Sequence, residues 1–208
     1  MNWRGFGVLG RRFADFVLFG VTLGELAILV ILTPTFTFLD WIYVLQHLLV
    51  LGIALTRRPP KVQDRSLSSA AAVIVSYGYP YAQVIYLNWI PGNPGSPKAG
   101  FVLVTLSTAL SLASLLTLGR LFGVRPALRG LMTKGPYRIV RHPMYLSYVV
   151  SDIGYNLQEW SPVTVLMVIA GWVSLIYRIH AEERVLAQDA GWPAYTGLVR
   201  YRLIPGLW

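Results

Sequence analysis

Residues 135–145 bring together side chains that bind anions, stack on rings and donate hydrogen bonds. They read Gly-Pro-Tyr-Arg-Ile-Val-Arg-His-Pro-Met-Tyr. Pro143 suits the first turn of a helix, because its missing N–H group costs nothing there. Arg141 and His142 then lie directly before the helix N-terminus, where free N–H groups and the helix dipole favour an anion such as a carboxylate. This segment is the first candidate binding site, with Tyr145 one turn into the helix.

A second polar cluster and an aromatic tail follow in the last part of the chain. If residues 143–158 and a helix starting at 162 form a hairpin, this cluster meets residues 135–145 at one membrane face. An alternative is that the cations only snorkel and the aromatic rings only form an interfacial belt. The cluster and the tail comprise Arg178, His180, Glu182, Glu183, Arg184, Trp192, Tyr195, Arg200, Tyr201 and Arg202.

The composition indicates an integral membrane protein. Of the 208 residues, 55% are hydrophobic and only 13% are charged, against about 25% in soluble domains. The chain is too apolar for intrinsic disorder. It contains no cysteine, which excludes a disulfide scaffold and thiolate metal sites.

Apolar stretches near the length needed to cross a bilayer predict the fold. We expect an all-α, polytopic transmembrane helical bundle of five to six membrane segments. It would include a C-terminal helical hairpin around Glu159–Ser161 and end in a cytoplasmic helix and tail. The predicted segments are 13–32, 36–55, 67–90, 100–118, 143–158 and a sixth that begins with 162–177.

The distribution of basic residues predicts the orientation of this bundle. With six segments, all of the 18 Lys and Arg residues except Lys98 fall on one side. Cytoplasmic loops carry such an excess of Lys and Arg, so both termini are expected in the cytoplasm, at a bacterial inner membrane. The net charge of +9 is then mainly a topology signal, and no nucleic-acid partner is expected.

Three motifs in the C-terminal half resemble a known family. They are Gly-Pro-Tyr-x-x-x-Arg-His-Pro-x-Tyr at 135–145, the pair Glu182-Glu183, and Arg-Leu-Ile-Pro-Gly at 202–206. Together they resemble the isoprenylcysteine carboxyl methyltransferases, and phospholipid N-methyltransferases share much of the pattern. The resemblance covers roughly residues 100–208. It implies a membrane-embedded methyltransferase that uses S-adenosylmethionine and releases S-adenosylhomocysteine. We therefore expect one integral membrane domain over 1–208, with N-terminal spans in 1–99 and the methyltransferase core in 100–208.

The resemblance also implies roles for individual residues. Arg141 and Arg202 match cations near the cofactor carboxylate or the substrate, and no metal is expected. Where the family often has Arg and Tyr in its tail, this chain has Leu198 and Trp192. The residues expected to bind the cofactor are Lys134, Gly135, Pro136, Tyr137, His142, Pro143, Tyr145, Glu182 and Glu183.

Asp152 is the candidate residue on the substrate side. Ionisable residues within a membrane segment are functional candidates by default. A carboxylate acceptor needs a nearby cation and no base, whereas an amine acceptor must lose a proton. We predict that Asp152 lies near the acceptor; the alternative is that it pairs with Arg or Tyr in the bundle.

The expected substrate is hydrophobic or lipid-anchored, because a site between helices at the lipid boundary is open to membrane lipids. The reaction we expect first is carboxyl methylation of an isoprenylcysteine-type acceptor. Phospholipid N-methylation, or methylation of another small hydrophobic acceptor, is the alternative. A non-enzymatic scaffold or transporter is the alternative from another class. Whether the protein is a monomer or a homodimer stays open.

Overall fold

The computed structural model describes residues 20, 22–24, 26–27, 30–31 and 38–208. The chain divides into two compact units, Met1–Arg57 and Arg58–Trp208. In the first unit the predicted segment 36–55 is observed as helix α2, Phe38–Thr56. Most of the predicted segment 13–32 lies outside the described residues.

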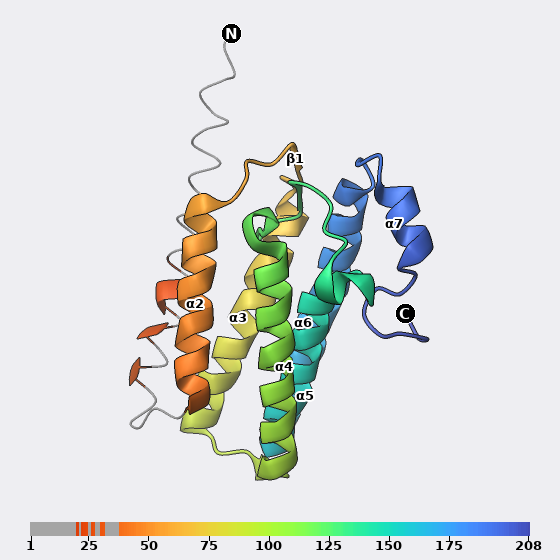
Figure 1. The fold of residues 1–208 in the computed structure, drawn as a ribbon. Helices are drawn as coiled ribbons and strands as arrows, with labels where there is room; N and C mark the ends of the chain where they lie inside the picture. The colour runs from red at the N-terminus through yellow and green to blue at the C-terminus, as the bar shows by residue number, and fades with distance from the viewer. Residues whose placement is uncertain (1–19, 21, 25, 28–29, 32–37) are drawn as a thin grey trace. The chain divides into compact units, whose positions relative to one another are not determined.

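Four long helices build the second unit. They are α3 (Leu67–Trp89), α4 (Pro97–Leu118), α5 (Pro143–Gln158) and α6 (Pro162–Leu186). They run side by side, with α4 packed along α5 and α3 packed along α6 (Figure 1). A short helix, α7 (Trp192–Leu198), lies beside one end of α6. The predicted helical architecture is confirmed for this unit.

The sixth predicted segment, which begins with 162–177, continues as one helix to Leu186. In the extension His180 and Arg184 are exposed, whereas Ile179, Ala181 and Val185 are buried together with Arg178 and Glu183. An amphipathic turn of this kind keeps a helix packed after its uniformly apolar part ends. The candidate residues Glu182 and Glu183 therefore lie on a rigid helix.

Two short antiparallel pairs tie the connections together at opposite ends of the unit. Strand β1 (Val62–Gln63) pairs with β3 (Ala127–Leu128). Strand β2 (Asn93–Pro94) pairs with β4 (Glu159–Trp160), which is the turn between α5 and α6. Between β3 and α5 the chain forms a 3-10 turn, η2 (Gly135–Arg138), after an earlier one, η1 (Gly119–Leu121), at the end of α4. The candidate segment 134–142 thus lies in the connection between α4 and α5, which pack against each other.

The number of membrane segments is not confirmed. Within the described residues, 97–121 and 162–186 are long and apolar enough to cross a membrane. Helix α3 has sufficient length, but its serines, tyrosines and buried Gln83 lower its hydropathy. Helix α5 has 16 residues and is therefore about 24 Å long, less than a bilayer core of about 30 Å.

Candidate active site

The N-terminus of α5 is joined to the C-terminal tail by backbone hydrogen bonds. Helix α5 begins at Pro143 with His142 as its N-cap residue, which confirms the predicted start. The Arg141 amide donates to the Tyr201 carbonyl, and the His142 amide donates to the Arg202 carbonyl, each at 2.9 Å. These bonds bring the tail against the Arg-His-Pro motif.

Glu183 binds three of the predicted site residues at once. Its Oε1 lies 3.2 Å from His142 Nε2 and 3.3 Å from Arg141 Nε. Its Oε2 accepts a hydrogen bond of 2.9 Å from Arg202 Nε. Burial lowers the pKa of Arg141, and the Glu183 carboxylate opposes that shift. Glu183 therefore holds together Arg141, His142 and Arg202, which come from distant parts of the sequence.

Glu182 has a different partner and faces a different space. Its Oε2 accepts a hydrogen bond of 2.8 Å from the Tyr145 hydroxyl. It lines a cavity, whereas Glu183 and Arg202 line a second pocket together with Tyr177 and His180. The two adjacent carboxylates of the acidic pair thus face different sides of α6 and have different partners.

The cavity lies between η2, the start of α5, the end of α6 and the loop that follows α4. Of the residues predicted to bind cofactor or substrate, Tyr137, Arg141, His142, Tyr145 and Glu182 line it. The complete lining is Tyr77, Leu118, Leu121, Phe122, Gly123, Arg125, Ala127, Arg129, Gly130, Leu131, Met132, Tyr137, Arg141, His142, Met144, Tyr145, Tyr148, Arg178, Glu182, Leu186 and Tyr195.

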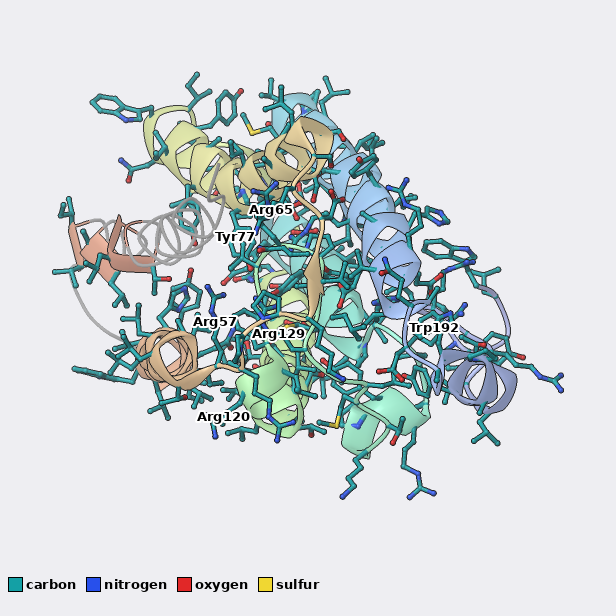
Figure 2. All side chains as sticks on the ribbon, turned by 90° about the horizontal axis from the view of Figure 1, so that it is seen from above. Arg57, Arg65, Tyr77, Arg120, Arg129 and Trp192 are labelled. Atoms are coloured by element: carbon teal, nitrogen blue, oxygen red, sulfur yellow. The ribbon has the colours of Figure 1, made fainter. Side chains whose placement is uncertain are left out.

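Tyr195 and Trp192 attach α7 to this cavity. The Tyr195 hydroxyl donates to the Tyr137 carbonyl at 2.9 Å, and burial raises the Tyr195 pKa to about 12. The Arg141 guanidinium lies 5.9 Å from the centre of the Trp192 ring, within cation–π range. Trp192 is the first residue of α7 and is labelled in Figure 2. Trp192, which stands where the family often has Tyr, therefore brings an indole ring close to Arg141, one of the predicted site residues.

Gly135 and Lys134 shape the turn before the motif. Gly135 has a φ of +54°, and a Cβ there would lie 2.8 Å from the hydroxyl of Thr117. Both the backbone angle and the space require glycine. Lys134 is the exposed N-cap residue of η2. Pro136 follows within the turn and Pro143 opens α5. None of these four residues is among the described residues that line the cavity.

Asp152 does not line the cavity. Its side chain is 7% exposed, and its Oδ2 accepts hydrogen bonds from Tyr79 at 2.6 Å and from Trp172 at 2.8 Å. These partners come from α3 and α6, so Asp152 joins three helices. This is the pairing within the bundle that the sequence left open as the alternative to a role near the acceptor.

The sequence-based site omitted Tyr77, Arg125, Arg129 and Arg178, which also line the cavity. In the sequence, Arg125 and Arg129 carry only a topology signal. Arg178 was assigned to the second polar cluster without a specific role. A basic residue in a loop has the same sequence signature whether it faces water or a cavity, so only the folded chain separates the two.

Two kinds of comparison show which known proteins this part of the chain is similar to. Residues 97–189 match the family model described as phospholipid methyltransferase. Protein-S-isoprenylcysteine O-methyltransferase B of Arabidopsis thaliana is 24% identical over 128 residues, which cover 59% of this chain and 65% of that protein. Protein-S-isoprenylcysteine O-methyltransferase A of the same plant is 29% identical over 98 residues, covering 44% of this chain and 50% of that protein.

The chain covers less than two thirds of the length of either plant relative. The matched segment 97–189 carries the whole described cavity lining except Tyr77 and Tyr195. The match and the cavity therefore describe the same part of the molecule. This part of the chain is similar to the phospholipid methyltransferase family and to the two plant isoprenylcysteine O-methyltransferases.

Proposed function

We propose that this protein is an integral membrane methyltransferase that takes S-adenosylmethionine at the cytoplasmic face. Its acceptor is a lipidic or lipid-anchored molecule. The observation that carries the proposal is the cavity that joins Arg141, His142 and Tyr145 to Glu182 within the segment that matches the family. This joins the most specific part of the motif to Glu182 of the acidic pair in one cavity.

The residues around the cavity fit this cofactor chemically. The rings of Tyr137, Tyr145 and Tyr195 offer apolar faces for a base. Glu182 offers a carboxylate for ribose hydroxyls or an ammonium group, and Arg141 offers a cation for a carboxylate. These are the group types that a nucleoside amino acid requires.

The chain's own residues contribute mainly by positioning. When bound, S-adenosylmethionine supplies a methyl group activated by a sulfonium. His142 and Arg141 are held by Glu183, and Tyr145 is held by Glu182, so the walls of the cavity are fixed before a ligand enters. Preorganised side chains of this kind lower the entropic part of the barrier.

The acceptor proposed first is an isoprenylcysteine-type carboxylate, because both plant relatives are named for that reaction. A carboxylate oxygen attacks without losing a proton. The second candidate, a phospholipid amine, is favoured by the family model. An amine must release a proton, and Glu182 is the carboxylate among the described cavity residues that would accept it.

Binding of S-adenosylhomocysteine to the purified protein in detergent tests the proposal. We expect saturable binding, and at least a tenfold loss in His142→Ala. Labelled cofactor is then offered with N-acetyl-S-farnesylcysteine or with phosphatidylethanolamine vesicles, and the labelled product identifies the acceptor. Absence of binding at millimolar ligand would contradict the enzyme and favour a scaffold or transporter.

A further inference from the structure

Two segments beside the cavity form a surface that lies to the side of the long helices. They are residues 134–142, which include η2, and residues 192–208, which include α7 and the C-terminal tail. Backbone bonds between the Arg-His-Pro motif and the tail join them. Figure 1 shows α7 and the tail beside the long helices, and Figure 2, seen from above, shows α7 at their side rather than over their ends. We call these two segments the lateral surface.

The lateral surface exposes large apolar side chains. Ile139, Leu198 and Leu207 are 65%, 85% and 76% exposed, although Tyr195 of α7 is buried. Helix α7 therefore has one side packed on the protein and another side that is open. Apolar side chains that gather on an open surface mark contact with a partner or with a membrane.

The lateral surface is also basic. Lys134, Arg138 and Arg200 are exposed on it, and its two segments contain no Asp or Glu. Within the described residues, none of these three cations takes part in an ion pair. Asp189, in the turn before α7, accepts a hydrogen bond from the Gly191 amide. The surface therefore fits a partner that is both apolar and anionic.

The opposite end of this unit has the features of a membrane boundary. Trp89 ends α3 and Trp160 lies in the turn between α5 and α6, and they are 80% and 42% exposed. The pairing of β2 with β4 holds these two chain reversals together. Exposed Trp side chains are enriched where a bilayer meets water. The turn between α5 and α6 therefore fits one boundary of the bilayer.

The length of α5 then gives the depth of the lateral surface. Helix α5 has 16 residues, about 24 Å along its axis, and its N-terminus is bonded to the tail. A hydrocarbon core is about 30 Å thick, so this N-terminus does not pass the second boundary. Helix α6 has 25 residues, about 38 Å, and does pass it. The chain thus leaves the hydrocarbon through α6 and returns to its edge through α7, where the Tyr195 hydroxyl bonds to the Tyr137 carbonyl.

We propose that the lateral surface binds the anionic phospholipids of the cytoplasmic leaflet. Its exposed apolar side chains enter the edge of the hydrocarbon, and its three exposed cations contact lipid phosphates. Interfacial segments that combine apolar and basic side chains bind membranes in this way, and anionic lipids strengthen the binding. A soluble acidic protein would fit the charges, but the depth of the surface favours lipid. The inference rests on the membrane location proposed above and not on methyl transfer.

Single cysteines that carry a nitroxide label test this depth, because the chain contains no cysteine. Ile139→Cys and Leu198→Cys are placed separately in nanodiscs of phosphatidylcholine and phosphatidylglycerol. We expect both labels to collide more often with oxygen, which concentrates in lipid, than with the uncharged, water-soluble nickel ethylenediaminediacetate. Val173→Cys, on an exposed side of α6, is the reference for lipid. Gln188→Cys, exposed just after α6, is the reference for water.

A pair of substitutions tests the cations. The label at Leu198→Cys is expected to show at least a twofold higher ratio of oxygen to nickel collisions in nanodiscs with phosphatidylglycerol than in phosphatidylcholine alone. Arg138→Gln combined with Arg200→Gln should abolish this difference. Lys61→Gln combined with Arg65→Gln is the matched control, because it removes the same charge from exposed residues outside the lateral surface. The control pair should keep the difference.

Three results would overturn the lipid-binding surface while Val173→Cys reports lipid. The first is a water-like collision ratio at Ile139→Cys or Leu198→Cys, which would leave the surface to a soluble partner. The second is an equal ratio in the two kinds of nanodisc. The third is an equal effect of the two pairs of substitutions, because net charge alone would then explain it. A water-like ratio at Val173→Cys would instead contradict the membrane location in the proposed function.

Discussion

At the scale of single residues, the adjacent carboxylates of Glu182 and Glu183 have different partners. Glu182 faces the cavity and binds Tyr145, whereas Glu183 binds Arg141, His142 and Arg202. The simplest expectation for either residue is a local ion pair with Arg178 or Arg184 on the same helix. The structure instead gives both carboxylates partners from other elements, and a carboxylate with several partners is harder to replace than one surface pair.

Glu183→Gln is expected to release the tail and weaken cofactor binding at least tenfold. The amide removes the charge that holds Arg141 and Arg202, and breaking a half-buried cluster of this kind costs about 3 kcal/mol. Limited trypsin cleavage after Arg200 and Arg202 should become faster.

Glu182→Gln is the matched control for tail release, because Glu182 does not contact the tail in any described interaction. Its cleavage pattern should equal that of the wild-type protein. Equal cleavage of Glu183→Gln and the wild-type protein would show that the backbone bonds alone hold the tail.

At the scale of elements, the site depends on how closely α4 and α5 approach. A Cβ at Gly154 would lie 2.9 Å from Val104 Cγ2 and 3.0 Å from the Gly100 carbonyl. Small residues that allow such approach are typical of helix pairs in membranes. Since η2 and the Arg-His-Pro motif connect these two helices, their spacing sets the position of the motif.

Gly154→Ala is therefore expected to lower the free energy of unfolding by about 1–3 kcal/mol, as overpacking does. The measurement is thermal unfolding in detergent. The control is Gly78→Ala in α3, where a Cβ meets no atom within 4 Å. Because alanine favours a helix over glycine, the control should be neutral or slightly stabilising. Equal melting temperatures of the two variants would contradict the packing argument.

A second prediction at the scale of elements concerns Asp152, which connects three helices. Asp152→Asn should lower thermal stability, because its carboxylate joins Tyr79 of α3 and Trp172 of α6. Binding of S-adenosylhomocysteine should change less than threefold, since Asp152 does not line the cavity. If turnover falls while stability and cofactor binding are unchanged, the predicted role near the acceptor is supported instead.

At the scale of the whole molecule, the open question is which regions lie on which side of the membrane. The chain has no cysteine, so single cysteines report position directly. We expect Lys98→Cys to react with a membrane-impermeant maleimide applied to intact cells. Arg138→Cys, in the exposed turn η2, should react only after permeabilisation. The reverse labelling pattern would contradict the predicted orientation.

The sequence by itself determined the local features of the site. Pro143 determined the start of α5. The apolar segments located α3 to α5 to within a few residues and gave the start of α6, and the motif indicated which residues gather near the cavity. These features depend on near neighbours in the chain, such as a proline in a first turn or an apolar run of helical length. The full extent of α6 was not evident, because a hydropathy run ends where an amphipathic turn begins.

Only the tertiary structure decided which charges face each other. His142 and Glu183 are 41 residues apart, yet their side chains lie 3.2 Å apart. Arg125 and Arg129 look like topology signals in the sequence, but the folded loop places them on the cavity with Arg178. Asp152 resembles a catalytic carboxylate until Tyr79 and Trp172 are seen to bind it. The physical reason is that a charge's role depends on its partners and its exclusion from water, which folding sets through contacts distant in sequence.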